Sequence, residues 1–476
     1  MKSKLTRPKF EENIEFNTEQ KKALDLLYNF VSSEEEKFFV LNGYAGTGKT
    51  TLIKELADYC LDRDIPFILL ASTGRAAKVL SRKTGYNACT VHRHIYMLDV
   101  SELDDKSKSK KVKFRLVENI DPESAVYIID ESSMLSDKQL VQTLSLFGSG
   151  SLLDDFVSFT GKRKIVFVGD NAQLPPINSS FCPALDLSYL AQKYCVKGAS
   201  FNLKKIERFD NLPVIKLNAE FLLNVIRSEN YNTFMKIRTE EFENVKVFSL
   251  DSIMIEDYVN KFKRTSIDEC IFVTYSNKLA SSVNREIRAF LYGDNQKDLY
   301  PGEVLMVQQN NYLHNVANGE HIEVKNVTGE EHKRAGLSFL PVEAEINEAS
   351  GKRKFECLLM KDYLNLGQAR LSNEFEYALT VDFIIRMKKK GIESKSDSIL
   401  FKEMLMNDPY LNSIRSRYGY AVTCHKAQGG EWQNVYIVFE KSLWHPNNIK
   451  NKFRWVYTAL TRTQTNLYLL DNIAII

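Results

Sequence analysis

A glycine-rich loop between an apolar strand and a helix constrains this chain more than any other feature of its sequence. The loop, Gly43-Tyr44-Ala45-Gly46-Thr47-Gly48-Lys49-Thr50, follows the apolar run 38–41 and precedes a helical pattern that begins at Thr51. This is G-x-x-x-x-G-K-[ST] in the strand–loop–helix context that the pattern requires. Glycines let successive backbone N–H groups point at phosphate oxygens, and the helix N-terminus favours negative charge. The loop therefore predicts a nucleoside triphosphate site, in which Lys49 contacts the β- and γ-phosphates and Thr50 holds Mg²⁺.

Two more apolar runs end in polar residues that suit the same site. The run VYIID ends at Asp130 and is followed by Glu131, while KIVFVGD is followed shortly by Gln173. An aspartate at a strand end beside a phosphate loop can hold Mg²⁺, and a neighbouring glutamate can polarise the attacking water. A strand-end Asp-Glu pair that only starts a helix is the alternative, and the presence of Lys49 makes it the weaker one. We expect Gln173 to sense the γ-phosphate.

Short apolar runs of this kind occur in two separate stretches of the chain and alternate with helical patterns. Such runs are typical of strands buried on both faces of a parallel sheet. At 476 residues the chain exceeds one ordinary domain. We predict an α/β protein with two P-loop-type domains, at 1–215 and 216–476. A polar, lysine-rich insertion (about 94–119) interrupts the first domain, and a β-rich insertion (about 320–415) interrupts the second.

Composition narrows the class of protein. The net charge is only +3, but the run KSKSKKVKFR (106–115) holds six basic residues and no acidic one. Seven scattered cysteines, none in a Cys-x-x-Cys pair, argue against a disulfide framework or a zinc ribbon. The pair His92-x-His94 lacks a third metal ligand nearby. No apolar run is long enough for a membrane span. We expect a monomeric cytoplasmic protein without membrane contact.

With these motifs in order, the chain resembles superfamily 1 helicases, in the branch of RecD-like and phage Dda-like enzymes. The resemblance runs from Phe16 to about Arg462. It rests on FNTEQ (16–20), which looks like the Q motif, GDNAQLPP (169–176), which looks like motif III, TCHKAQG (423–429), which looks like motif V, and YTALTR (457–462), which looks like motif VI. The glutamine before the motif V glycine and the Leu-Pro-Pro of motif III favour the 5′→3′ branch.

The resemblance implies two RecA-like domains with ATP between them, and an SH3-like domain in the second insertion. Arg462 and, by a looser match to motif IV, Arg227 would reach the nucleotide from the opposite domain. In GTPases such an arginine finger accelerates hydrolysis by roughly 10³–10⁵-fold. The alternative for Arg227 is that it is an arginine on the surface of a helix, without a role at the nucleotide. The expected nucleotide-binding residues, including the adenine-reading Gln20, are Gln20, Gly43, Ala45, Gly46, Thr47, Gly48, Lys49, Thr50, Thr51 and Gly429.

The resemblance also implies a track for single-stranded DNA across both domains. Such tracks combine polar contacts to phosphates with flat groups that stack on bases. For any one of the hydroxyls taken alone, helix capping by Ser or Thr is the better explanation, and the case for a track rests on their repetition across both halves. In related helicases the first insertion is a duplex-splitting hairpin, and Phe114 is the aromatic residue we expect against the terminal base pair. The complete set is Thr73, Arg75, Thr90, His92, Phe114, Thr274, Tyr275, Asn277, Thr423 and His425.

The sequence thus predicts an ATP- and Mg²⁺-dependent DNA helicase that moves 5′→3′ on single strands and acts at single/double-strand junctions in replication, recombination or repair. A single-strand binding protein or other replication proteins are plausible partners. An RNA helicase and an ATP-driven translocase or loading factor without unwinding activity stay open as alternatives. A P-loop kinase leaves the second half and Arg462 unexplained.

Overall fold

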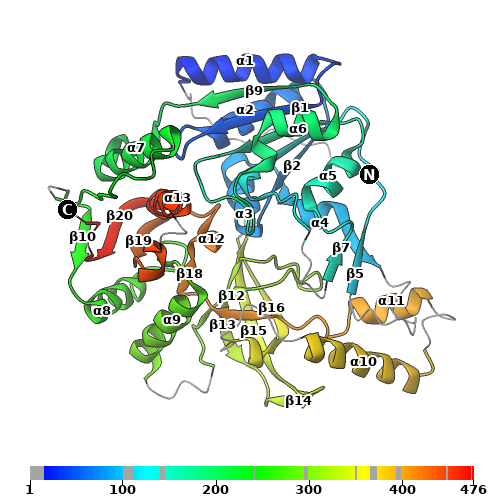
Figure 1. The fold of residues 1–476 in the computed structure, drawn as a ribbon. Helices are drawn as coiled ribbons and strands as arrows, with labels where there is room; N and C mark the ends of the chain where they lie inside the picture. The colour runs from blue at the N-terminus through cyan, green and yellow to red at the C-terminus, as the bar shows by residue number, and fades with distance from the viewer. Residues whose placement is uncertain are drawn as a thin grey trace.

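The computed structural model describes residues 15–99, 112–139, 145–240, 242–293, 299–348, 351–364, 373–392, 398–445, 449–472 and 474–475. Two α/β units and a β-rich unit make up this part of the chain (Figure 1). The first α/β unit holds the N-terminal helices and the phosphate loop. The second contains the C-terminal strands, and the β-rich unit lies against both.

A parallel sheet forms the centre of the first unit. Its strands, in spatial order, are β3 (Ala88–Thr90), β2 (Phe67–Ala71), β6 (Val126–Asp130), β8 (Lys164–Gly169), β1 (Phe38–Gly43) and β9 (Gly198–Leu203). Alternate residues of β1 enter different clusters, since Phe38 and Val40 pack on one face while Phe39 and Leu41 pack on the other. Both faces are therefore buried, as the continuous apolar runs predict.

Helices cover both faces of this sheet. They are α1 (Thr18–Ser32), α2 (Lys49–Asp62), α3 (Gly74–Thr84), α4 (Val91–Ile95), α5 (Leu152–Thr160) and α6 (Leu187–Tyr194), with short 3-10 turns at η1 (Ser132–Met134), η2 (Pro183–Leu185) and η3 (Arg208–Asn211). Helix α1 begins with a capping box, in which the Asn17 side chain accepts from the Gln20 backbone and the Gln20 side chain accepts from the Asn17 backbone.

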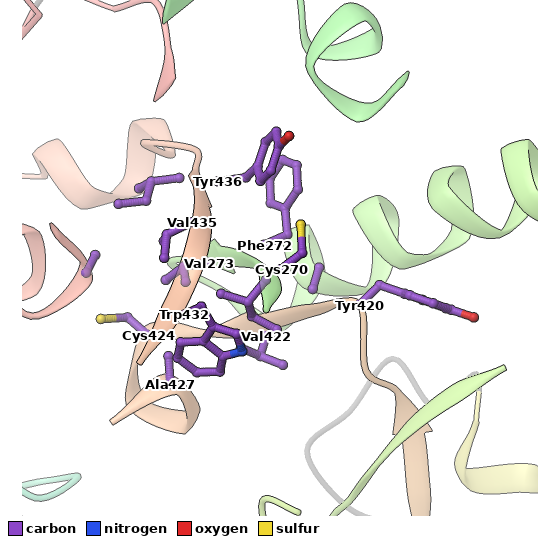
Figure 2. Packing of buried hydrophobic residues seen from close by; sticks show 14 of the residues in the cluster. Cys270, Phe272, Val273, Tyr420, Val422, Cys424, Ala427, Trp432, Val435 and Tyr436 are labelled. Carbon is purple, nitrogen blue, oxygen red and sulfur yellow. The ribbon is translucent and has the colours of Figure 1, made fainter. Parts of the chain in front are cut away.

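A second parallel sheet forms the other α/β unit. Its order is β10 (Val245–Phe248), β20 (Thr463–Leu470), β19 (Trp432–Ile437), β11 (Cys270–Thr274) and β18 (Ala421–Thr423). The helices are α7 (Pro213–Ser228), α8 (Asp251–Phe262), α9 (Asn277–Tyr292), α12 (Cys424–Ala427) and α13 (Ile449–Leu460), with η5 at Lys441–Trp444. Figure 2 shows the core around β11 and β19, where Phe272 stacks on Tyr436 and Trp432 fills the end near α12.

The β-rich unit is an antiparallel sheet inserted between β11 and β18. Its order is β14 (His332–Arg334), β15 (Leu337–Glu348), β13 (His321–Val327), β12 (Val304–Val307) and β17 (Ser416–Tyr418), and β16 (Gly351–Met360) pairs with β15. Turn η4 (Lys361–Tyr363) and helices α10 (Asn373–Lys389) and α11 (Ser398–Met406) follow β16. The sheet extends beyond the predicted insertion at both ends, because β12 and β17 pair with each other.

The β-rich unit connects to the second parallel sheet through a very short link. Strand β17 ends at Tyr418 and β18 begins at Ala421, so only Gly419 and Tyr420 lie between an antiparallel strand and a parallel one. Tyr420 is fully buried, and its hydroxyl accepts a hydrogen bond from the backbone of Val304 at 3.2 Å. The link is thus fixed in place at both of its ends.

The first insertion contributes a small three-stranded sheet. Strand β4 (Tyr96–Asp99) pairs antiparallel with β5 (Val112–Leu116), and β7 (Ser145–Phe147) runs parallel to β5. Residues 100–111, which include most of the lysine-rich run, lie outside the described residues. Within the described ranges, no helix is both long enough and apolar enough to cross a bilayer.

Candidate functional site

A cavity of about 660 Å³ lies where the two α/β units meet, a size typical of small-molecule sites. Most of its wall comes from the first unit, and Glu431 and Arg462 close it from the second. Its lining consists of Glu15, Phe16, Asn17, Gln20, Ala45, Gly46, Gly48, Lys49, Thr50, Thr51, Lys83, Asp130, Glu131, Gln173, Lys205, Glu207, Arg208, Glu431 and Arg462. The cavity thus unites predicted residues that are widely separated in the sequence.

The phosphate loop has the conformation that its glycines allow. Gly46 and Gly48 have φ values of 80° and 89°, and a Cβ at Gly48 would lie 2.5 Å from the Gln20 amide nitrogen. These glycines leave the loop backbone open toward the cavity, a cradle that suits phosphate oxygens. The Lys49 ammonium donates to the carbonyls of Gly43 (2.7 Å) and Tyr44 (3.1 Å). Lys49 lines the cavity, where phosphate oxygens could replace these two carbonyls as acceptors for its ammonium group.

Gln20 contacts the phosphate loop directly. Its side-chain nitrogen donates to the Thr47 carbonyl at 3.1 Å, and its oxygen accepts from the Asn17 backbone at 3.0 Å. Both ends of the amide are therefore engaged, so here Gln20 braces the loop as well as lining the cavity. Gly43 and Thr47 belong to the loop but are not among the described residues that line the cavity.

Two adjacent carboxylates stand at the end of β6. Burial raises the pKa of Asp130, an effect that Lys49 opposes. Burial, followed by the charge of Asp130, raises the pKa of Glu131 to about 7, while Arg462 and Lys49 act in the opposite direction. Glu131 has a left-handed φ of 53°, and its buried Oε2 has no hydrogen-bond partner in the structure. Strained backbone and an unsatisfied carboxylate together are typical of a functional position.

Thr50 and Asp130 are the residues that could hold a divalent cation. Both line the cavity beside Lys49, and both offer oxygen, the ligand type that Mg²⁺ prefers. Burial of the Asp130 carboxylate disfavours its ionised form, which a bound cation would favour. The donor set therefore fits Mg²⁺.

Gln173 follows β8 and enters the same cavity. Its side-chain nitrogen lies 3.4 Å from Asp170 Oδ2, and its buried oxygen has no partner in the structure. Asp170 is fully buried at the strand end. An amide oxygen without a partner at the cavity wall is available to a water molecule or a ligand.

Arg462 is the cation that the second unit presents to the cavity. Only 3% of it is exposed, and its guanidinium donates to the carbonyls of Thr458 (2.9 Å) and Gly430 (3.2 Å). These bonds fix its direction. Gly429 lies nearby with a φ of 73°, and a Cβ there would approach Ala76 to 2.7 Å, so it serves close packing between the units and does not line the cavity.

Arg208, for which the sequence analysis makes no prediction, and the predicted Arg227 lie in different places relative to the cavity. Arg208, in η3, lines the cavity and pairs with Glu431 at 2.6 Å. Arg227, at the end of α7, is outside the lining; it donates to the Tyr44 hydroxyl at 2.7 Å and lies over that ring. The structure thus brings Arg462 to the cavity, and adds Arg208 in place of Arg227.

Glu431 is a cavity residue that sequence analysis missed. It pairs with Lys83 at 3.2 Å as well as with Arg208, so it joins the second unit to two elements of the first. Burial alone would raise the pKa of Glu431, but Arg208, Lys83 and Arg462 lower it to about 2. Its position two residues after the motif V glycine was the available signal.

Four predicted nucleic-acid residues lie at the carboxyl ends of strands. Thr73 and Thr90 cap α3 and α4, accepting from Ala76 and Arg93 at 3.2 Å each. Thr274 is fully buried and donates to backbone carbonyls. Thr423 precedes α12 without a side-chain cap. Capping is therefore a sufficient local role for Thr73 and Thr90, whereas Thr423 has none that the geometry reveals.

Neighbouring residues of the second unit complete the predicted set there. Tyr275 packs edge-on against Trp455, Asn277 is exposed in the first turn of α9, and His425 is half-buried with a pKa lowered by burial. These residues follow β11 and β18, which are adjacent in the sheet. The structure brings them together at one sheet edge.

Arg75 lies in an interface between units, where 13% of its side chain is exposed. Its guanidinium lies 4.0 Å from the Trp432 ring and 3.0 Å from His321 Nδ1, and Asp268 is 3.8 Å away. Burial lowers its pKa to about 10. Arg75 therefore joins α3 to the second unit and the β-rich unit.

Phe114 and His92 also have aromatic neighbours. Phe114 stacks on Phe147 at 4.4 Å and approaches Tyr312 of the β-rich unit at 6.0 Å. His92 contacts Phe147 edge-on, and burial lowers its pKa to about 4, so it is neutral at physiological pH. His94 bonds to Asp121 at 2.9 Å, away from His92. Phe114 thus lies within an aromatic cluster between two units.

The fold and this cavity define a P-loop nucleotide-hydrolase class of protein. The AAA domain family matches residues 15–220, and the UvrD-like helicase C-terminal domain matches residues 418–470. Together these matches cover both walls of the cavity. In these segments the chain is similar to superfamily 1 helicases, in the branch of Pif1- and RecD-like proteins.

Individual relatives agree with this placement. The chain is 24% identical to an uncharacterised protein of Methanocaldococcus jannaschii over 95% of its own length and 38% of that protein. It is 25% identical to the ATP-dependent DNA helicase Dda of Enterobacteria phage T4, over 61% of this chain and 60% of Dda. It thus spans less than two thirds of both. A solved structure of Pif1 helicases at forked duplex DNA shares the fold, with 17% identity, a TM-score of 0.50, and 98% and 94% of the chains covered.

Proposed function

We propose that this protein is an ATP-dependent DNA helicase that moves 5′→3′ on a single strand and separates duplex strands. One observation supports this above all: the nucleotide cavity of the first unit is closed by Glu431 and Arg462 of the second. A nucleotide bound there contacts both units, so its hydrolysis changes how they are held together. The relationship to Dda, whose name describes an ATP-dependent DNA helicase, supports DNA as the track.

In this mechanism the chain's own residues hold and activate the ATP substrate. Backbone N–H groups of the loop and Lys49 bind the phosphates, and Glu131 accepts a proton from the attacking water. Its raised pKa makes it a base suited to neutral pH. Gln173 orients that water, and Arg462 with Arg208 stabilises the negative charge that develops on the γ-phosphate. Mg²⁺, held by Thr50 and Asp130, would neutralise phosphate charge when bound.

Arg208 replaces Arg227 in this scheme because it lines the cavity. To reach the γ-phosphate, Arg208 must exchange its ion pair with the Glu431 carboxylate for one with the phosphate, so its charge is neutralised by an anion in both states. Arg227 would support the loop through Tyr44.

The single strand would cross the sheet edges that carry Thr73, Thr90, Thr274 and Thr423, with His425 and Asn277 beside them. We assign 1–215 and 216–476 as RecA-like motor domains and the antiparallel sheet as an SH3-like domain. The β4–β5 pair would form the duplex-splitting hairpin. Phe114, on β5 of this pair, stacks on Phe147 and is the aromatic residue that we propose against the terminal base pair. The motor acts as a monomer.

Strand displacement on two matched DNA duplexes tests the proposal. One duplex has a 5′ single-stranded tail, the other a 3′ tail, and Lys49→Ala serves as the inactive control. Unwinding from the 5′ tail alone supports motor and polarity. A preference for the 3′ tail refutes the polarity. DNA-stimulated ATPase without unwinding favours a translocase or loading factor, and stimulation by RNA alone favours an RNA helicase.

A further inference from the structure

The hydroxyl of Tyr457 connects three elements that meet behind the nucleotide cavity. Tyr457 lies on α13 of the second unit and is fully buried. Its oxygen accepts a hydrogen bond from the Ala45 backbone N–H, in the phosphate loop, at 2.9 Å. The same hydroxyl donates to Asp170 Oδ2 at 2.8 Å. One O–H group therefore bridges the loop and the end of β8, from the other side of the cleft.

Asp170 extends this bridge to the cavity. Its carboxylate accepts from the Ala172 backbone at 2.9 Å and lies 3.4 Å from the side-chain nitrogen of Gln173. Because that nitrogen is held, the orientation of the Gln173 amide, whose oxygen is unpartnered, is fixed at the cavity wall. The position of Gln173 thus depends on a carboxylate that Tyr457 holds.

Helix α13 contacts the same turn at further points. The Leu174 backbone donates to the Thr458 hydroxyl at 3.1 Å, and Arg454 donates to the Gln173 carbonyl at 2.9 Å. Arg462 follows α13 directly. A displacement of α13 therefore moves Arg462 and the Asp170–Leu174 turn together, and only the Tyr457 hydroxyl among these contacts also includes the phosphate loop.

We infer that Tyr457 is a positioning residue that couples the phosphate loop and the Gln173 turn to the second unit. The inference rests on the proposed function. Removing the hydroxyl leaves the Ala45 N–H and one bond of the Asp170 carboxylate unsatisfied, and both residues are buried. Formation of the closed, hydrolysing state is then disfavoured. Nucleotide affinity changes less, because Tyr457 is outside the cavity lining.

The test is Tyr457→Phe, measured by steady-state ATPase with saturating single-stranded DNA. We expect kcat to fall about tenfold or more while the KM for ATP stays within about threefold. Tyr436→Phe is the matched control: this tyrosine is equally buried, belongs to the same unit and donates to Asp257 at 2.6 Å, far from the cavity. Tyr436→Phe also removes a tyrosine hydroxyl that donates to an aspartate, and the kcat of this variant should be unchanged.

A double-mutant cycle with Asp170→Asn identifies the route. If Tyr457 acts through Asp170, the double variant is no slower than the slower single variant, whereas Tyr436→Phe and Asp170→Asn have independent effects. Equal kcat for the two Tyr→Phe variants, a change confined to KM, or effects of Tyr457→Phe and Asp170→Asn that multiply would overturn the inference. If Tyr457→Phe does not fold, Asp170→Asn alone must show the kcat loss. Absence of DNA stimulation in the unsubstituted protein refutes the proposed function instead.

Discussion

The raised pKa of Glu131 predicts how ATP hydrolysis depends on pH. Its carboxyl titrates near pH 7 because it is buried and adjoins Asp130, whereas an ordinary glutamate titrates at 4.5. A general base must be ionised to accept a proton. Lowering the pH through 7 therefore removes the active form of the enzyme, and the rate falls toward the acid side.

The expected magnitude follows from that pKa. At about pH 6 only about a tenth of Glu131 is ionised, so kcat/KM for ATP should be about tenfold below its value at about pH 8.5. Because kcat/KM reports the enzyme before MgATP binds, this is the constant to measure, with DNA saturating and the MgATP concentration varied. Glu131→Gln should remove the activity. It should also stabilise the fold above pH 7, where ionisation of the buried Glu131 costs folding free energy, and this gain should disappear as the pH falls toward 4.5.

Glu431→Gln is the control, since it removes a carboxylate from the same cavity whose pKa is about 2. Its activity should still fall through pH 7, whatever its absolute rate. An activity of the unsubstituted enzyme that is flat between about pH 6 and pH 8.5 would refute the assignment of Glu131 as the base. So would a Glu131→Gln variant that hydrolyses ATP normally.

Three further predictions concern binding, charge and packing. Lys49→Ala should abolish ATP hydrolysis while single-strand binding, measured by fluorescence anisotropy, is largely retained; normal turnover would contradict the phosphate-loop assignment. Arg208→Ala should lower the single-turnover hydrolysis rate by about 10³-fold or more, and Arg227→Ala by far less; the reverse order would restore the sequence-based choice of Arg227. Trp432→Ala should lower the free energy of unfolding in urea by about 3–5 kcal/mol, because the side chain is 1% exposed and its indole N–H donates to the Ile267 carbonyl. If Trp444→Ala, at a half-buried tryptophan, lowered it as much, the contact between Trp432 and Arg75 would contribute little to stability.

The α/β class was predictable because its signals are local. Runs such as 38–41 and 126–129 contain no charged residue, so a sheet covered on both faces is the arrangement that buries them. The phosphate loop is equally local, since its glycines and Lys49 adjoin one another. Arg462 was placed from its motif, and the structure brings it to the cavity.

Residues whose surroundings depend on distant segments were harder to place. Arg208 and Arg227 both belong to the segment that connects β9 to β10, and Arg208 lines the cavity because η3 passes beside the phosphate loop, where the Arg208 backbone donates to the Gly46 carbonyl. Arg75 follows a strand as a phosphate ligand would, yet Trp432 and His321, which bury it, come from other units. Phe114 follows basic residues that suggest exposure, but Phe147 and Tyr312 cover its ring. Side-chain contacts between residues of different units leave no periodic pattern in the sequence, so sequence analysis cannot detect them.

The two-residue link between β17 and β18 has a mechanical consequence. With only Gly419 and Tyr420 between β17 and β18, the antiparallel sheet has little freedom to move relative to Thr423. Because the Tyr420 ring is buried, the link is also restricted in rotation. The β-rich unit is therefore joined rigidly to β18, the strand that ends at Thr423. A displacement of the β-rich unit should therefore also displace Thr423 and His425, which follow this link. Lengthening the link with a few glycines would weaken this coupling, although the chain between α9 and β12 would still join the two units.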